Sequence, residues 1–373
     1  MLEIEPDRIL IVKLSAIGDV VHTLPFLEVL AERFPRAKID WLVEEESSAV
    51  PDGHPALNRL IVSRRRSWQT DFILNGGRKT VLAETAGFVR DLRSIRYDVV
   101  VDLQGLFKSA VLTWLARGGL KVGPSGGREC SRIALNRPPV PVDYHWHAID
   151  RYLEVAHIMG CRKRGWTGRI PVGPEDRAAA AAILRENGLE RAPLVAINPM
   201  ARWKTKLWVP ERFSILADRI SQELGASVAF TGSPGDRPWI ERIRNQCCTK
   251  PVNLAGLTTL KELAEIYARC SVVVSTDTGP MHIAAAMGCP VVALFGPTAP
   301  WRTGPYGPGH RVVREPVECG PCFRKSCGSR KCMEAITPED VLQEVQSLLE
   351  KNHGPEEGRE DLVRGFQSHV EFR

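Results

Sequence analysis

The feature that most constrains this chain is an alternation of short β-branched runs with helical patterns, which occurs in both halves. In the first half, strand-like runs at 9–12, 39–43 and 99–101 alternate with helical patterns at 23–34 and 81–94. Strands separated by helices are typical of βαβ units and of a mostly parallel sheet. The first half therefore predicts an α/β domain.

The alternation pauses near residues 169–175, where Pro171 and Pro174 interrupt it, and then restarts. A chain of 373 residues is long for a single hydrophobic core. We therefore predict an α/β fold with two doubly wound domains that face a central cleft. The predicted domains cover 1–172 and 173–350, and a charged, disordered tail covers 351–373.

The second half supplies its own set of predicted elements. Gly225 follows a helical pattern at the position where a glycine commonly ends a helix. The final helix is expected either within the second domain or packed back onto the first. The expected strands are 194–198, 228–230, 272–274 and 291–295, and the expected helices are 175–187, 210–224 and 338–350; a further helix, 148–159, is expected at the end of the first domain.

Composition excludes some classes of protein. No apolar run approaches the roughly 18 residues that span a bilayer, and the amino terminus lacks the pattern of a secretory signal, so a cytoplasmic location is expected. The net charge of +6 fits an ordinary solvated surface. The basic clusters at 64–66 and 162–164 also suit an anionic partner, such as phosphate, carboxylate or an acidic membrane face. No nucleic-acid-binding signature is present, and no such partner is expected.

Asp19 follows the first predicted strand, in the run Lys13-Leu-Ser-Ala-Ile-Gly-Asp19. In open α/β sheets, ligands bind beyond the carboxyl ends of strands, so Asp19 is a candidate proton acceptor. It could equally be a helix cap. Lys13 and His22 are secondary candidates.

A second strand-turn-helix pattern contains Asp277, Thr278, Gly279 and His282. Backbone N–H groups at the start of such a helix can bind a diphosphate. A carboxylate repels phosphate, so Asp277 is expected to point at sugar hydroxyls while the amides of Thr278 and Gly279 hold phosphate. The alternative is a purely structural turn.

Cations and polar loops follow two other strands of the second half. Arg202 and Lys206 are interleaved with Trp203 and Trp208 and could neutralise a departing diphosphate, or they could be exposed cations beside a tryptophan that covers the core. The loop containing Ser233 and Asp236 follows the next strand and is expected to line the same cleft. Neither the dinucleotide-binding glycine pattern nor a P-loop is present.

Four of the ten cysteines, Cys319, Cys322, Cys327 and Cys332, lie close together. Thiolates at this spacing could hold a structural zinc ion or an iron–sulfur cluster. Paired C-x2-C knuckles are missing, and free or reversibly paired thiols fit as well. We expect no catalytic role for these residues and no catalytic metal.

These stretches together resemble the lipopolysaccharide heptosyltransferases of glycosyltransferase family 9, most closely the type I members, over nearly the whole chain to about residue 350. The motifs that carry the resemblance are 13–19, 203–208, 277–282 and 295–297. The resemblance implies the GT-B architecture and inverting, metal-independent transfer from ADP-L-glycero-β-D-manno-heptose. It also implies a lipid A–Kdo type acceptor and an enzyme in peripheral contact with the anionic inner face of the inner membrane.

Site roles come from the same resemblance. Asp19 falls on the proposed catalytic base. The residues implied in donor binding are Lys206, Arg202, Ser233, Asp236, Leu257, Asp277, Thr278, Gly279 and His282. The residues implied in acceptor binding are Arg64, Arg65, Arg66, Lys108, Arg128, His147 and Arg151.

This chain departs from the type I pattern at Pro234, where those enzymes carry an acidic residue, so Asp236 substitutes or the contact is absent. The cysteine-rich loop looks more like other members, including type II. Other readings are a related transferase with a different nucleotide sugar or acceptor, and a non-catalytic protein that senses sugar nucleotides or metal.

Overall fold

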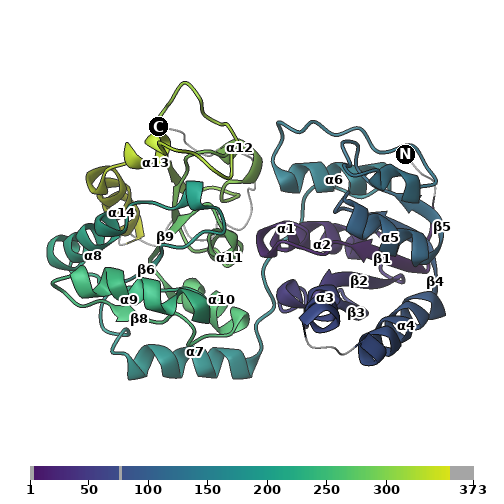
Figure 1. Cartoon of the computed structure of the whole chain (residues 1–373), viewed down its shortest axis with the longest axis horizontal. Helices are drawn as coiled ribbons and strands as arrows, with labels where there is room; N and C mark the ends of the chain where they lie inside the picture. Colours follow the sequence, from purple (N-terminus) through teal and green to yellow (C-terminus); the bar gives the residue numbers. More distant parts are fainter. Residues whose placement is uncertain (1–3, 75–77, 353–373) are drawn as a thin grey trace. The chain divides into compact units, whose positions relative to one another are not determined.

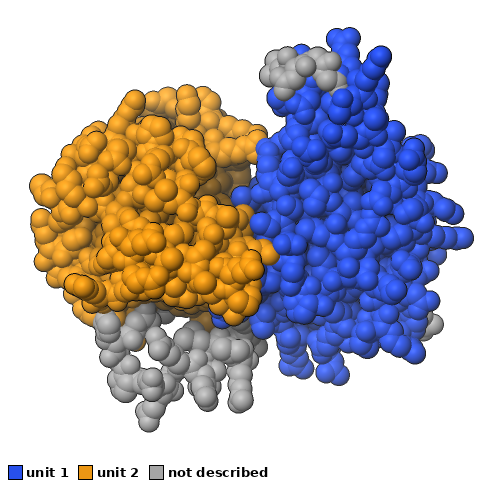
Figure 2. Space-filling model, turned by 90° about the horizontal axis from the view of Figure 1, so that it is seen from below, with its two compact units in different colours: residues 1–171 blue, residues 172–373 orange. Residues whose placement is uncertain are grey.

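The computed structural model describes residues 4–74 and 78–352, so most of the predicted tail, from 353 onward, lies outside the described residues. The chain divides into two compact units, 1–171 and 172–373, which Figure 2 colours separately. Each unit contains its own parallel sheet with helices around it (Figure 1). The predicted α/β class is therefore confirmed.

The first unit contains a five-stranded sheet in the order β3-β2-β1-β4-β5, and every neighbouring pair is parallel. Its strands are β1 (Arg8–Val12), β2 (Lys38–Glu44), β3 (Arg59–Ser63), β4 (Arg96–Asp102) and β5 (Arg117–Val122). Its helices are α1 (Ile17–Val21), α2 (Leu24–Arg33), η1 (Glu45–Ser47), α3 (Arg65–Leu74), α4 (Arg78–Ser94), α5 (Phe107–Leu115), η2 (Ser131–Ala134) and α6 (Ala148–Ile158).

Both faces of this sheet are buried. Side chains alternate between the faces of a strand, and Leu10 and Val12 of β1 join a core cluster with Leu92 of α4. Ile9 and Ile11 point to the opposite face and are also fully buried. Strands buried on both faces read as continuous apolar runs rather than as alternating patterns, which is why the run at 9–12 identifies a central strand.

The second unit repeats this plan with six parallel strands in the order β11-β10-β9-β6-β7-β8. Its strands are β6 (Leu194–Asn198), β7 (Ser227–Phe230), β8 (Val252–Asn253), β9 (Val272–Thr276), β10 (Val291–Leu294) and β11 (Arg311–Val313). Its helices are α7 (Pro174–Glu186), η3 (Lys204–Lys206), α8 (Pro210–Leu224), η4 (Pro234–Asp236), α9 (Arg237–Gln246), α10 (Leu260–Arg269), α11 (Gly279–Ala286), α12 (Pro300–Thr303), α13 (Lys331–Glu334) and α14 (Pro338–Asn352).

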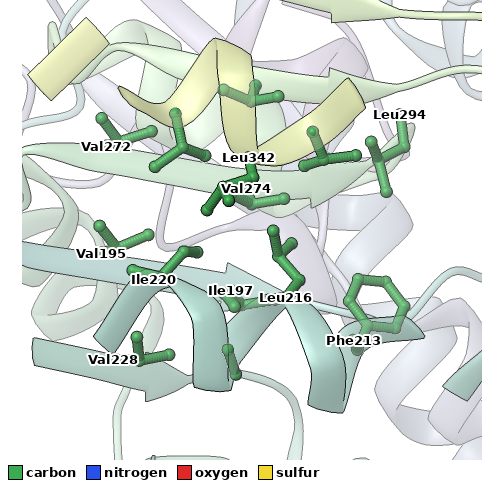
Figure 3. Packing of buried hydrophobic residues seen from close by; sticks show 14 of the residues in the cluster. Val195, Ile197, Phe213, Leu216, Ile220, Val228, Val272, Val274, Leu294 and Leu342 are labelled. Carbon is green, nitrogen blue, oxygen red and sulfur yellow. The ribbon is translucent and has the colours of Figure 1, made fainter. Parts of the chain in front are cut away.

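One face of the second sheet packs against α8 and α14. Figure 3 shows Leu216 of α8 and Leu342 of α14 close to Val274 of β9. The final helix thus places its apolar face in the core of its own unit. Among the described residues, no helix is long and apolar enough to cross a bilayer.

Strand order reverses at the centre of both sheets. In the first unit the chain moves outward from β1 to β2 and β3, and later outward on the other side from β4 to β5. In the second unit, β6 and β9 are the corresponding neighbours. Loops that leave such adjacent strands diverge, and ligands of open α/β sheets bind at this point. The fold therefore marks the loops after β1, β4, β6 and β9.

Some elements differ from those expected. The helical pattern expected from Thr23 is α2, and a separate short helix, α1, precedes it. The edge strand β5 was not predicted, because glycines are unfavourable in strands. Packing requires one of them: a Cβ at Gly118 would lie 2.5 Å from a methyl carbon of Val100.

The α8 packing generates a matched test of the core. Leu216→Ala should lower the free energy of unfolding by about 2–5 kcal/mol, because Leu216 is fully buried in the cluster of Figure 3. Ile215→Ala is the control, because Ile215 is 48% exposed on the same helix and should change stability by less than about 0.5 kcal/mol. Urea unfolding measures both variants, and equal effects would contradict the assigned packing.

Candidate active site

Asp19 lies in α1, directly after the loop that leaves β1. Its Oδ2 accepts a hydrogen bond of 3.2 Å from the backbone N–H of Ala16, the residue that caps the helix. Asp19 therefore caps from the third helical position and is not itself the N-cap, which corrects the simple capping interpretation. Its side chain remains half-buried at the carboxyl edge of the sheet.

The buried ammonium group of Lys13 interacts electrostatically with Asp19. Lys13 is 3% exposed, and its Nζ donates to the hydroxyl of Tyr152 at 2.6 Å and to the carbonyl of Leu103 at 3.0 Å. Burial alone lowers the pKa of Lys13, but Tyr152 and the carboxylates of Asp19 and Asp102 outweigh it, so the pKa lies above the ordinary value. Lys13 is thus a fixed positive charge near Asp19.

The loop after β4 holds this arrangement in place. Gln104 Oε1 accepts backbone hydrogen bonds from Leu14 and Ser15, at 3.1 and 3.0 Å. Asp102 Oδ1 in turn accepts the backbone N–H of Gln104 at 2.9 Å. The two divergent loops at the centre of the sheet are therefore joined by side-chain hydrogen bonds.

Glu44, at the carboxyl end of β2, collects cations beside the same loop. It is 2% exposed, and its Oε1 accepts from Lys108 at 3.1 Å and from Arg65 Nη2 at 2.8 Å. Lys108 also donates to Ser15 Oγ at 2.6 Å. Burial raises the pKa of Glu44, but Arg65 and Lys108 outweigh it and hold the pKa below its usual range. Burial lowers the pKa of Lys108.

Three of the predicted acceptor-binding arginines, those at 64–66, form ion pairs with carboxylates. Arg64 contacts Glu45 and Glu84, Arg65 contacts Glu44, and Arg66 contacts Glu46, at 3.2, 3.3, 2.8 and 2.5 Å. Their side chains remain 32–48% exposed. An anion that binds here must exchange with these carboxylates.

Two further predicted acceptor residues, His147 and Arg151, lie at the start of α6. His147 is the N-cap of α6, where its Nδ1 accepts the N–H of Ile149 at 3.2 Å, and its ring meets that of His22 edge-on at 4.9 Å. Arg151 lies 4.7 Å above the ring of Tyr144. Arg128 is exposed and is tied through its backbone to the loop after β4.

In the second unit, Lys206 and Asp277 form an ion pair at the point where the strand order reverses. Lys206 Nζ lies 2.6 Å from Asp277 Oδ2 and donates to the backbone carbonyl of Asp277 at 3.2 Å. Thr298 Oγ1 donates to the same Oδ2 at 2.6 Å. Oδ2 of Asp277 is thus held by Lys206 and Thr298, and the contact of Asp277 with sugar hydroxyls stays a prediction.

The helix α11 begins directly after Asp277. Thr278 is its extended N-cap and Gly279 its first residue, and both are partly exposed. The first N–H groups of a helix have no partner within the helix and carry its positive dipole end. His282, the fourth residue, is buried at 7% exposure. This end of the helix suits an anionic group.

The two tryptophans near Lys206 have different roles. Trp208 is fully buried and donates to the carbonyl of Ile336 at 3.0 Å, so it covers the core as the structural alternative predicts. Trp203 has Lys206 over its ring at 4.7 Å and Lys325 at 5.3 Å. Arg202 is exposed beside this group.

The remaining predicted donor residues lie in two adjacent loops. Ser233 donates to Asp236 Oδ2 through both its N–H and its hydroxyl, at 2.9 and 2.6 Å. Gly256 N donates to the carbonyl of Gly232 at 3.0 Å, which brings the loop of Leu257 beside that of Ser233. Leu257 is 47% exposed. Asp236 is therefore engaged locally, with Ser233.

The cysteine-rich loop, residues 319–332, supports the turn that carries Lys206. Thr205 Oγ1 donates to the carbonyl of Arg324 at 2.8 Å, and Phe323 N donates to the carbonyl of Pro297 at 2.8 Å. The four cysteines are free thiols. Across residues 4–74 and 78–352, no group of three or more potential ligands is arranged to hold a metal ion. The loop thus has an observed packing role.

Several site residues were not predicted: Glu44, Gln104, Tyr152, Thr298 and Lys325. Glu44 and Thr298 carried a usable signal, because both closely follow apolar strand runs, where polar side chains reach the carboxyl edge of a sheet. Tyr152 and Lys325 carried none, because their partners are distant in sequence.

The chain is similar in sequence and in fold to known glycosyltransferases. The model of glycosyltransferase family 9 (heptosyltransferase) matches residues 86–333. The chain is 32% identical to lipopolysaccharide heptosyltransferase 1 of Pseudomonas aeruginosa, over 92% of this chain and 98% of that protein. A family 9 glycosyl transferase from Veillonella parvula matches with a TM-score of 0.80 at 27% identity, over 94% of this chain and 99% of that one. Escherichia coli heptosyltransferase WaaC with ADP-2-deoxy-2-fluoro heptose matches with a TM-score of 0.71 at 28% identity, over 91% and 99%.

The Glu44 cluster generates a stability prediction. Glu44→Gln should lower the free energy of unfolding by about 3 kcal/mol, because it leaves Arg65 and Lys108 without their shared counter-charge. Glu46→Gln is the control: Glu46 is 51% exposed and pairs with Arg66 at the surface, so the loss should stay below about 1 kcal/mol. Urea unfolding at neutral pH compares the two.

Comparison of wild type with Glu44→Gln also gives a pH test. Because the pKa of Glu44 is lowered in the folded state, its contribution is present above the unfolded pKa and is lost as pH falls through the folded pKa. The stability difference between wild type and Glu44→Gln should therefore shrink below about pH 4. A difference that stays constant to lower pH would show that charge is not its cause.

Proposed function

The chain belongs to glycosyltransferase family 9 and is a glycosyltransferase of GT-B architecture; from that premise we propose that it transfers L-glycero-D-manno-heptose from ADP-heptose to the Kdo region of the lipopolysaccharide inner core. The observation that carries the proposal is the contrast between the two points where strand order reverses. One presents a carboxylate, Asp19, and the other presents Lys206 beside the start of α11.

The proposed chemistry is a single displacement. Asp19 takes the proton from an acceptor hydroxyl, whose oxygen attacks the anomeric carbon of the heptose as the bond from that carbon to the ADP oxygen breaks. The electron pair of the broken bond leaves with ADP, and attack from the opposite face inverts the anomeric centre. The proton on Asp19 then passes to solvent.

The leaving diphosphate gains negative charge as it departs. In the proposal, Lys206 and the N–H groups of Thr278 and Gly279 stabilise that charge. In other enzymes a metal ion provides this stabilisation. Lys206 is held by Asp277, and Asp277 by Thr298, so the ammonium group is positioned before the donor arrives. The further proposed donor contacts are Arg202, Ser233, Asp236, Leu257, Asp277 and His282.

The acceptor is an anionic glycolipid, and we assign its charged groups to the basic residues around the β1–α1 loop. Arg65, Arg66 and Lys108 share Glu44 as their counter-charge. An incoming phosphate or carboxylate therefore takes the place of Glu44 as the partner of one of these cations. The full proposed set is Arg64, Arg65, Arg66, Lys108, Arg128, His147 and Arg151. Since the acceptor is embedded in a membrane, the enzyme is proposed to work at the cytoplasmic surface of the inner membrane.

The function has a direct test. Incubation with ADP-heptose and Kdo-lipid A should add one heptose to the acceptor, as measured by mass spectrometry. A panel of nucleotide sugars tests the donor, and an acceptor that already carries one heptose tests for a type II activity. Donor binding without transfer to any acceptor would contradict the proposal and favour a sensing role.

Asp19→Asn should fold normally and lower turnover by about a hundredfold or more, because an amide cannot accept the hydroxyl proton. Donor affinity, measured by calorimetry with ADP-heptose, should stay within about twofold of wild type, because Asp19 is assigned to the acceptor. Asp52→Asn, an exposed aspartate of the same unit, is the control and should turn over normally. Unchanged turnover in Asp19→Asn would remove Asp19 from its role.

Lys206→Met should weaken ADP binding about tenfold and lower turnover further, because the lost charge matters most as the diphosphate departs. Lys204→Met is the matched control, since Lys204 is exposed in the same turn and should keep both properties. The two variants are compared by calorimetry with ADP and by initial rates, and a donor affinity unchanged in Lys206→Met would contradict the assignment.

A further inference from the structure

The helix α5 exposes its large apolar side chains. Phe107, Val111 and Trp114 are 62, 39 and 66% exposed. Their spacing of four and three residues places them on one face of the helix. A surface helix normally turns such a face toward the core. This exposed face is therefore unusual.

The opposite side of α5 consists of small and polar residues. Ser109, Ala110 and Thr113 are its buried residues. Ser109 Oγ donates to Asp102 Oδ2 at 2.9 Å, which joins α5 to the end of β4. The orientation of α5 is thus fixed by contacts beneath it, and its aromatic face is held outward.

A neighbouring segment extends the apolar face. Ile133, on η2, is 82% exposed, and η2 packs against α5. The backbone N–H of Phe107 donates to Glu129 Oε2 at 3.1 Å, which ties the segment before η2 to the start of α5. We define the α5–η2 surface as Phe107, Val111, Trp114 and Ile133.

Positive charge accompanies this surface. Residues 107–137 contain six lysines and arginines but a single acidic residue, Glu129, whose carboxylate is engaged by α5. Arg117, Arg132 and Arg137 are exposed. The surface therefore combines apolar groups suited to a lipid interface with a local excess of cations.

We propose that the α5–η2 surface docks on an anionic phospholipid bilayer. Aromatic and aliphatic side chains enter the boundary between headgroups and acyl chains, where tryptophan is favoured. Exposed cations of the same segment, such as Arg132 next to Ile133, contact headgroup phosphates. A second copy of the chain fits less well, because two identical basic surfaces would repel each other when they pair face to face.

This inference extends the proposed function, since a membrane-embedded acceptor requires the enzyme to meet a bilayer. It can nevertheless be tested without donor or acceptor. Vesicles of phosphatidylcholine alone and of phosphatidylcholine with phosphatidylglycerol are mixed with the full chain, and co-sedimentation measures binding. The full chain should bind the anionic vesicles, and binding should weaken as salt rises.

Ile133→Ser and Trp114→Ser should each lower the vesicle-bound fraction by about tenfold in partition coefficient, because each removes a large apolar group from the interface. Ile215→Ser is the matched control, since Ile215 is also exposed but lies on α8 of the second unit, and it should bind as wild type. Arg132→Glu should reduce binding to anionic vesicles and leave binding to neutral vesicles unchanged.

Three outcomes would overturn the proposal. Wild type does not bind anionic vesicles, or Ile133→Ser and Ile215→Ser bind them equally. In the third, wild type binds no vesicles but forms a dimer in sedimentation velocity, and Ile133→Ser dissociates that dimer. Initial rates with a water-soluble acceptor fragment separate this result from the proposed function. Ile133→Ser should keep those rates, so a failure of transfer in wild type and a failure of docking are distinguishable.

Discussion

Everything in the proposed site depends on a sheet whose strand order reverses at its centre. Because the chain leaves β1 and β4 in opposite directions, their following loops diverge, and polar side chains can gather there without a strand or helix covering them. The same reversal occurs between β6 and β9. Lys13 and Asp19 occupy the first such point, and Lys206 and Asp277 occupy the second.

The two points differ in how charge is arranged. At the first, a buried ammonium, Lys13, interacts electrostatically with the carboxylate of Asp19 and is fixed by Tyr152 and a backbone carbonyl. At the second, the carboxylate of Asp277 forms an ion pair with the ammonium of Lys206. Each reactive group thus has an opposite charge near it, and Lys206 is positioned by direct contact with Asp277 before substrate binds. Such preorganisation is a large part of electrostatic catalysis.

Local sequence patterns predicted the central strands of both sheets, the turns that follow them and the residues directly after these strands. Asp19, Lys206 and Gly279 were found because a strand, a turn and a helix start are encoded within a few neighbouring residues. Contacts between distant residues were not predictable: Tyr152 is 139 positions from Lys13, and Lys108 is 64 positions from Glu44. The strand β5 was missed because its glycines are required by packing on β4, which no local pattern reports.

The arginine cluster of the first unit has a consequence for the rate of substrate encounter. Arg64, Arg65, Arg66 and Lys108 are matched by the carboxylates Glu44, Glu45, Glu46 and Glu84. A cluster whose charges sum to zero produces little electric field beyond one screening length, about 10 Å. It can select an anion on contact but cannot attract one from afar, so diffusion toward a charged target must be guided by unpaired cations elsewhere on the protein.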